Sequence, residues 1–214
     1  LAHEPLVLLF GFRGDRPKAQ EGNRARQRVA WLLGFGMIMG GVGVAGAGSL
    51  VWPGILFPAV PLLLLLPFFL LGSQKTLIGE LLVVTVFATL VFPIGAASMA
   101  DPMRMIGAAT VWWASFALGT VEVHAIKARH KGTQRSRWTR WGSPLLCGIS
   151  VLFCLGMVTY GGDPYRWPAL ALLPPASATL ILAILQVHPR HLKRVGWTLV
   201  GANATTLVIL LASG

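Results

Sequence analysis

Hydrophobic and polar positions alternate in long blocks along this chain, so that extended apolar stretches are separated by short polar segments. A stretch of about 17–25 predominantly apolar residues is what an α-helix needs to cross a hydrocarbon core of about 30 Å. The pattern predicts spans over residues 29–50, 51–71, 76–97, 105–126, 144–160, 168–187 and 195–212. We therefore expect an all-α, polytopic transmembrane helix bundle of about seven spans, forming a single domain over residues 1–214.

The first predicted span is rich in glycine, in the run GFGMIMGGVGVAGAG. Gly36 and Gly40 are four residues apart, as are Gly43 and Ala47, and positions four apart lie on one face of a helix. Small residues with this spacing let a neighbouring transmembrane helix approach closely. The sequence therefore predicts that these four residues form a helix-packing face.

Prolines interrupt two other spans. The second span contains Pro53, Pro58, Pro61 and Pro67, and the sixth contains the pair Pro174 and Pro175. Because proline has no backbone N–H, we expect the second span to be kinked or to start late and the sixth to bend at its pair. Neighbouring helices should then satisfy the freed carbonyls.

Composition supports a membrane protein and argues against a nucleic-acid-binding one. Of the 214 residues, 55% are hydrophobic and only 12% are charged, about half the charged fraction of a soluble domain. The net charge of +11 could suggest nucleic acid, but the basic residues lie in loops between spans and form no base-reading motif. A positive excess at a membrane surface explains them better, so we expect the lipid bilayer, and not nucleic acid, as a partner.

The lysines and arginines also predict an orientation. With residues 11–28 placed in the cytoplasm, the inner loops hold 16 of the 18 basic residues, and the outer loops hold only Arg104 and Arg166. Such a bias is the positive-inside pattern of a multi-pass protein. We expect a bacterial cytoplasmic (inner) membrane protein whose N-terminal end is cytoplasmic and whose C-terminus is outside.

The chain begins with Leu1, and its opening LAHEPLVLLFGF has neither a basic n-region nor a small-residue cleavage site. We expect the sequence to lack an upstream helical portion.

The two cysteines, Cys147 and Cys154, are seven residues apart in one span, so their Cα atoms should be about 10 Å apart. This separation is too long for a disulfide, and we expect buried free thiols.

Three ionisable residues stand inside apolar runs near the predicted cytoplasmic surface. Glu80 follows Lys75 by five residues and Glu122 precedes Lys127 by five, so each lies about 7–8 Å inside the end of its span. The third and fourth spans are consecutive and antiparallel, which puts both carboxylates at one level with His124 nearby. We therefore predict a polar cluster of Glu80, Glu122 and His124 at the cytoplasmic rim.

Three interpretations of this cluster stay open. The residues can be interfacial anchors that pair with nearby lysines and arginines. They can line a cytoplasm-facing cavity for a cation, a proton or a lipid head group. They can also ligate a metal or haem, although the two-residue spacing of Glu122 and His124 points their side chains about 200° apart. Metal ligands on one helix more often use three- or four-residue spacings.

No Walker loop, GxSxG, HExxH, CxxC or paired DxxD motif occurs in the sequence. We therefore predict no catalytic and no metal-binding residue, and the sequence does not define a cofactor.

Several segments resemble the YwiC-like family of bacterial membrane proteins. They are the opening LAHEPLVLLFG, the stretch QKTLIGELLVVTVFATLVFPIGAA, the run WWASFALGTVEVHAIKARHKG and the end KRVGWTLVGANATTLVILLASG. The resemblance implies a membrane topology and an additional N-terminal hairpin, but no biochemical activity. Where the family tends toward a tyrosine and an arginine near the end of the fourth span, this chain has Glu122 and His124.

Three functional hypotheses follow. The first is a non-catalytic accessory or structural subunit of a larger bacterial membrane complex, packed against other subunits through its glycine-rich span. The second is a membrane enzyme acting on an isoprenoid or lipid substrate at the cytoplasmic face, for which the acidic residues are few. The third is a small-solute or proton-coupled carrier, for which a midplane site and an internal repeat are missing from the sequence pattern. The absence of catalytic motifs favours the first hypothesis.

Overall fold

The computed structural model describes residues 15–46, 49, 51–73, 75–130, 137–160 and 162–212, and this part of the chain is helical and contains no strand. The helices are α2 (Asp15–Gly46), α3 (Val51–Leu70), α4 (Leu77–Thr89), α5 (Val91–Ala97), α6 (Pro102–His130), α7 (Arg137–Tyr160), α8 (Asp163–Leu185), the short 3₁₀ helix η1 (Pro189–His191) and α9 (Leu192–Ala212). The expected all-α fold class is confirmed.

Within the described residues, seven helical segments are long and apolar enough to cross a membrane. They are Asn23–Gly46, Val51–Leu70, Leu77–Ala97, Pro102–Ala128, Ser143–Tyr160, Tyr165–Leu185 and Pro189–Ala212. Each overlaps one predicted span, and the largest differences lie at the ends, where the helices continue beyond the apolar residues. The chain is therefore a multi-pass integral membrane protein.

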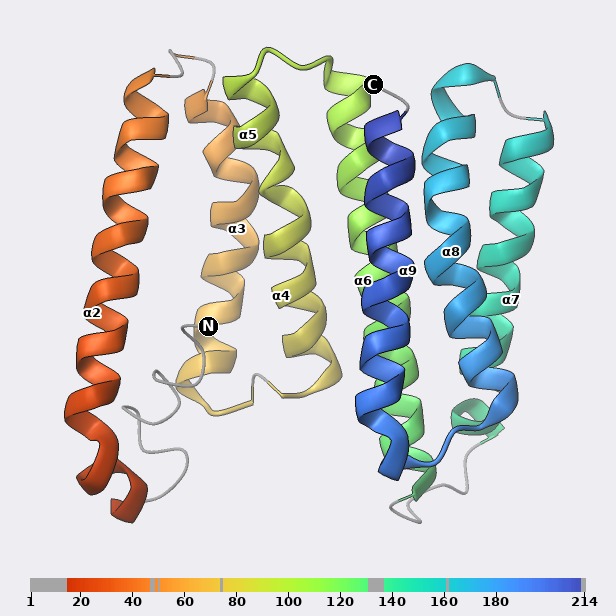
Figure 1. Ribbon diagram of the computed structural model, residues 1–214, viewed down its shortest axis with the longest axis horizontal. Helices are drawn as coiled ribbons and strands as arrows, with labels where there is room; N and C mark the ends of the chain where they lie inside the picture. Colours follow the sequence, from red (N-terminus) through yellow and green to blue (C-terminus); the bar gives the residue numbers. More distant parts are fainter. Residues whose placement is uncertain are drawn as a thin grey trace.

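The helices stand side by side and alternate in direction (Figure 1). One group consists of α3, α4 and α5, and a second consists of α6, α7, α8 and α9. The two groups meet where α4 and α5 contact α6. α2 stands at one edge of the bundle, and its one appreciable contact within the described residues is with α5.

The third predicted span is one membrane segment but two helices, because the helix is interrupted at Leu90. Pro93 explains the interruption, since it has no N–H to donate to the carbonyl of Thr89, four residues earlier. Next to this break, the Thr89 side-chain hydroxyl donates to the carbonyls of Thr85 at 2.7 Å and Val86 at 3.0 Å. Pro93 also lies directly against Gly54 of α3, where an added Cβ would be 3.0 Å from the Pro93 Cα. Only glycine permits this approach.

Several other prolines lie within helices that continue through them. α3 includes Pro58, Pro61 and Pro67, and α8 includes Pro168, Pro174 and Pro175. In α8, Pro175 cannot donate to the Ala171 carbonyl, and the hydroxyl of Thr206 on α9 donates to it at 2.7 Å instead. A neighbouring helix thus satisfies a carbonyl that proline leaves free, as the sequence argument expected.

The core of the second group lies along one stripe of α6. Val111, Ser115, Leu118, Glu122 and Ile126 recur every three or four residues, and all are buried. Two apolar clusters cover this stripe. One contains Leu118, Cys147 and Ala176, and the other contains Ile126, Leu182 and Val195. Cys147 and Cys154 are both buried and free, as predicted.

Candidate polar sites

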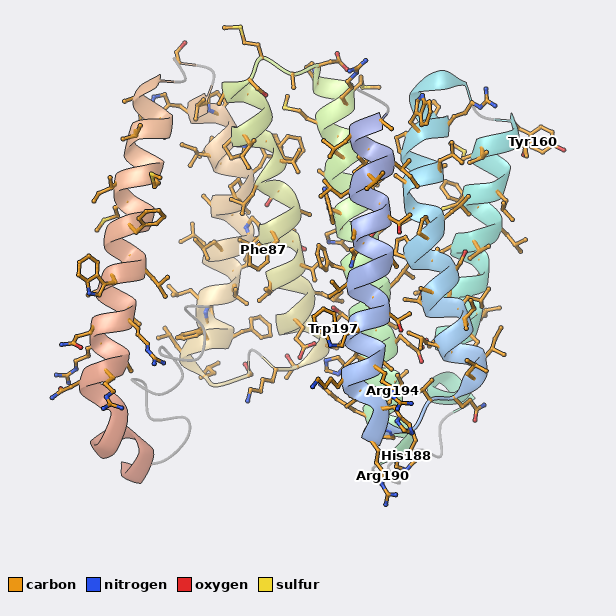
Figure 2. The ribbon with its side chains drawn as sticks, in the orientation of Figure 1. Phe87, Tyr160, His188, Arg190, Arg194 and Trp197 are labelled. Carbon is orange, nitrogen blue, oxygen red and sulfur yellow. The ribbon has the colours of Figure 1, made fainter. Side chains whose placement is uncertain are left out.

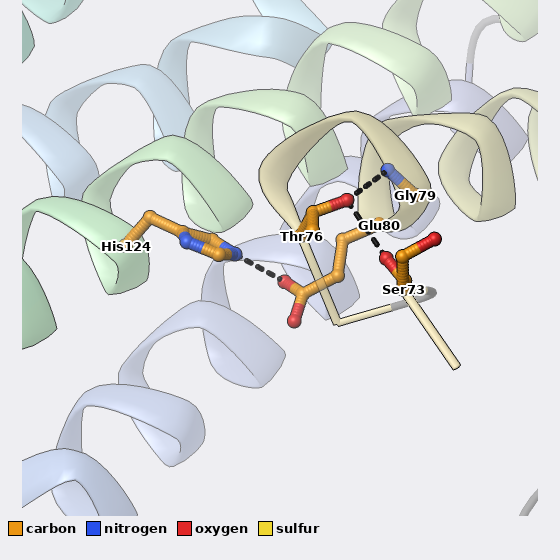
Figure 3. Close-up of polar contacts among 5 residues, drawn as sticks. All are labelled: Ser73, Thr76, Gly79, Glu80 and His124. Atoms are coloured by element: carbon orange, nitrogen blue, oxygen red, sulfur yellow. Dashed lines mark hydrogen bonds and ion pairs between the residues drawn. The ribbon is translucent and has the colours of Figure 1, made fainter. Parts of the chain in front are cut away.

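The Glu80 carboxylate is positioned by the start of α4. Thr76 caps this helix: its hydroxyl accepts from the Gly79 N–H at 3.2 Å and donates to the Ser73 carbonyl at 2.8 Å (Figure 3). The Glu80 N–H donates to the Thr76 carbonyl at 2.9 Å, so Glu80 stands in the first turn of α4. A carboxylate is favourable there because the helix N-terminus carries a partial positive charge.

Glu80 meets His124 across the contact between α4 and α6. The Glu80 Oε2 and the His124 Nε2 are 3.0 Å apart, and the side chains are 33% and 25% exposed (Figure 3). The two atoms are at ion-pair distance. The contact joins the two helix groups near one end of the bundle.

Glu122 has a different environment. Its side chain is fully buried and accepts a hydrogen bond from the hydroxyl of Ser143 on α7. Cys147 of α7 lies near it, and Thr179 of α8 is in turn a neighbour of Cys147. Two residues along a helix correspond to a rotation of about 200°, so α6 directs Glu122 toward α7 and α8 but His124 toward α4.

The structure gives a contact to each residue of the predicted cluster of Glu80, Glu122 and His124. It brings Glu80 and His124 together, whereas Glu122 has its own partner in Ser143. Ser143 was not predicted because it stands where the inner loop meets the fifth predicted span. The available signal was a hydroxyl at the first residue of the segment Ser143–Tyr160, which follows the span of Glu122.

A second polar contact joins α4 and α6 deeper in the bundle. The Nε1 of Trp113 donates to the hydroxyl of Thr85 at 3.0 Å. The adjacent Trp112 stacks on Phe116, with ring centroids 5.7 Å apart. Trp113 is thus a linking residue between the two helix groups, which its position in an apolar run did not indicate.

The glycine face of α2 is open within the described chain. A Cβ added at Gly36, Gly40 or Gly43 would meet no described atom within 4 Å. The expectation that this face packs against another helix of the same chain is therefore not met by the described residues, and packing against a partner stays a prediction. Ala47, the fourth residue of the predicted face, lies outside the described residues.

Over the described residues, no group of three or more histidine, cysteine or acidic side chains is arranged to hold a metal ion. Comparisons with protein-family models, with curated proteins and with solved structures find no match to this chain. The fold and its polar contacts are therefore the basis for assigning a function. They define a multi-pass membrane protein with a partly exposed Glu80–His124 pair, a buried Glu122 and one weakly attached helix.

Proposed function

We propose that this chain is a non-catalytic accessory or structural subunit of a larger bacterial membrane complex. The observation that supports this proposal is the open glycine face of α2, formed by Gly36, Gly40 and Gly43. Apolar side chains alone contribute little free energy to the association of two membrane helices, because lipid tails are equally apolar. Close packing of the two backbones contributes more to association, and small residues permit it.

The occupant of this face is a transmembrane helix of another membrane protein. Glycines over Gly36–Gly43 leave this part of α2 with few side chains to contact lipid. Lipid alone is therefore a poor neighbour for this face. Its large apolar residues, such as Trp31 and Met37, lie outside the face and are exposed. A partner helix could therefore approach the α2 backbone closely at Gly36, Gly40 and Gly43.

Gly40→Leu tests this proposal, with Gly41→Leu as the matched control. The two glycines are adjacent, at the same depth and equally open, but Gly41 lies about 100° round the helix and outside the face. Native complexes purified in mild detergent should lose their partner in Gly40→Leu and keep it in Gly41→Leu, as measured by co-migration and mass spectrometry. Identical complexes in both variants would reject the glycine face as the docking surface.

The proposal includes the bacterial cytoplasmic membrane, the positive-inside orientation and the resemblance to the YwiC-like family. Support for the orientation comes from the distribution of exposed basic side chains. Arg24, Lys75, Lys127 and Arg194 all lie at the end of the bundle where α4 begins and α6 ends. A membrane-impermeant thiol reagent applied to whole cells should label a cysteine at Met99, which is 86% exposed at the other end, and spare one at Lys75. The reverse pattern would invert the topology.

A proton-coupled carrier is the second candidate, and buried Glu122 is the observation that favours it. Ionisable residues inside membrane helices are rare and often mark proton or ion pathways. In vesicles loaded with a pH-sensitive dye, a carrier would give proton flux that Glu122→Gln abolishes without unfolding the protein. The subunit hypothesis predicts no flux in either protein. For an enzyme acting on isoprenoids or lipids, no contact described above gives comparable support.

A further inference from the structure

Two buried oxygen atoms in the second helix group have no hydrogen-bond partner among the described residues. They are the Oγ of Ser115 on α6 and the Oδ1 of Asn203 on α9. The Ser115 side chain is only 1% exposed. Among the described residues, the one other buried side-chain atom of this kind is the His124 Nε2, which faces Glu80 at 3.0 Å. The two oxygens are therefore the polar atoms that the contacts within the described chain leave unexplained.

The register of α6 and α9 puts these two oxygens at one level. An added Cβ at Gly119 would be 3.3 Å from the Cδ1 of Leu199, so these positions face each other. The two helices are antiparallel (Figure 1). Ser115 lies four residues before Gly119 and Asn203 lies four residues after Leu199, so both are displaced by about 6 Å in the same direction.

Both residues also lie on the helix faces that pack. Ser115 belongs to the buried stripe of α6, four residues from Gly119. Asn203 is four residues from Leu199 and three from Thr206, which bonds α8. Positions three and four apart share a helix face. Both side chains thus lie on packed helix faces next to the Gly119–Leu199 contact, and both oxygens are buried.

The level of these oxygens is the interior of the membrane. Ser115 is at the centre of the segment Pro102–Ala128, and Asn203 is in the second half of Pro189–Ala212. An unsatisfied polar group costs several kcal/mol in hydrocarbon, where no bulk water reaches it. Buried polar atoms of folded proteins are nearly always satisfied by protein or by an ordered ligand.

We propose that Ser115 and Asn203 hold one small ligand between α6 and α9. The ligand is either a water molecule, whose hydrogens would face the two oxygens, or a partly dehydrated monovalent cation. Both free atoms are oxygens, so each can accept a hydrogen bond or coordinate a cation, and neither carries a charge that would repel one. A water molecule needs two to four polar partners, and these atoms supply two. The site is a midplane polar site, a feature that the sequence pattern did not reveal.

The test compares apolar replacements. If the oxygens were unsatisfied, Ser115→Ala and Asn203→Leu would be neutral or stabilising, because each removes a desolvated polar group. If the two residues share a ligand, each replacement should lower the melting temperature by about 2–4 °C. The melting temperature of the double variant should then be little lower than that of either single variant, because one replacement already removes the ligand. Ser150→Ala is the control, since its exposed hydroxyl bonds only the Leu146 carbonyl of its own helix in the described contacts.

Melting in sodium, potassium and choline chloride at equal ionic strength identifies the ligand. A cation would raise the melting temperature in one salt, and this difference would vanish in Ser115→Ala. Equal melting in all three salts, together with coupled losses, assigns a water molecule. Neutral single replacements, or losses that add in the double variant, would overturn the proposal. If the volume of leucine prevents folding, Asn203→Ala takes its place with the same expectations.

Discussion

α2 and α6 are both apolar membrane helices, yet they differ in how their small and polar residues are used. The polar groups of α6 face other helices of this chain: Glu122 meets Ser143, His124 meets Glu80 and Trp113 meets Thr85. The glycines of α2 face no described part of the chain. Figure 2 shows the side chains of α2 projecting freely at the edge of the bundle.

This difference shows which features locate a helix inside a membrane protein. Exposed leucine or phenylalanine carries little information, since lipid and protein interiors are equally apolar. Glycine at a point of close approach and hydrogen-bonding side chains do carry information, because each needs a neighbouring helix. α6 finds its neighbours in this chain, and α2 is proposed to find one elsewhere.

The largest expected effect is at Glu122. Replacing it with alanine should destabilise the protein by about 2–4 kcal/mol, because a cavity forms and the Ser143 hydroxyl loses its acceptor. Thermal unfolding in detergent measures this loss. Glu80→Ala is the matched control, since Glu80 is 33% exposed and solvent can replace its contact; it should cost less than about 1 kcal/mol. Equal losses in the two variants would contradict the distinction between a buried and a rim carboxylate.

The second expected effect compares two glycines. Gly54→Ala should destabilise the protein by about 1–3 kcal/mol, because the new methyl group would be 3.0 Å from the Pro93 backbone, which cannot rotate away. Gly40→Ala meets open space and should be neutral or stabilise the helix by up to about 1 kcal/mol in the dissociated subunit. Thermal unfolding of both variants as purified subunits checks this pair. A destabilised Gly40→Ala subunit would mean that α2 is packed within its own chain.

The sequence predicted the number of spans because membrane thickness imposes a length on each apolar helix. It placed Glu80, Glu122 and His124 near one end of the bundle for the same reason, since depth follows from residue count at 1.5 Å per residue. Rotation of each helix about its axis is different. It depends on contacts with neighbours, and these were not available from the sequence alone.

The candidate site illustrates this limit. The spacing of Glu122 and His124 already indicated opposite directions, but not that His124 would face Glu80 or that Ser143 would face Glu122. The alignment of Ser115 with Asn203 depends on the register of α6 against α9, which residues more than 80 positions apart determine. The freed Ala171 carbonyl could be foreseen from Pro175, but its partner Thr206 could not.

A smaller effect is expected at Thr206. Its hydroxyl bonds the Ala171 carbonyl on α8, so Thr206→Val should cost about 1 kcal/mol by leaving that carbonyl without a donor. Thr205→Val is the adjacent control: its exposed hydroxyl bonds the Gly201 carbonyl of its own helix, and its loss should change stability by less than about 0.5 kcal/mol. Melting temperatures of the two variants check the order. Equal effects would mean that the interhelical bond between α9 and α8 adds nothing to stability.

The smallest effect concerns the link between the two helix groups at Glu80 and His124. Both side chains are partly exposed, so a double-mutant cycle of Glu80→Gln and His124→Gln should give a coupling of only about 0.2–1 kcal/mol. A second cycle, Glu80→Gln with Glu122→Gln, should give no coupling, because the carboxylates have separate partners on opposite sides of α6. Unfolding free energies measured at low and high salt complete the test, since added salt should weaken the first coupling. Coupling between the two glutamates would mean that Glu80 on α4 and Glu122 on α6 interact electrostatically. It would support the single polar cluster that the sequence predicted.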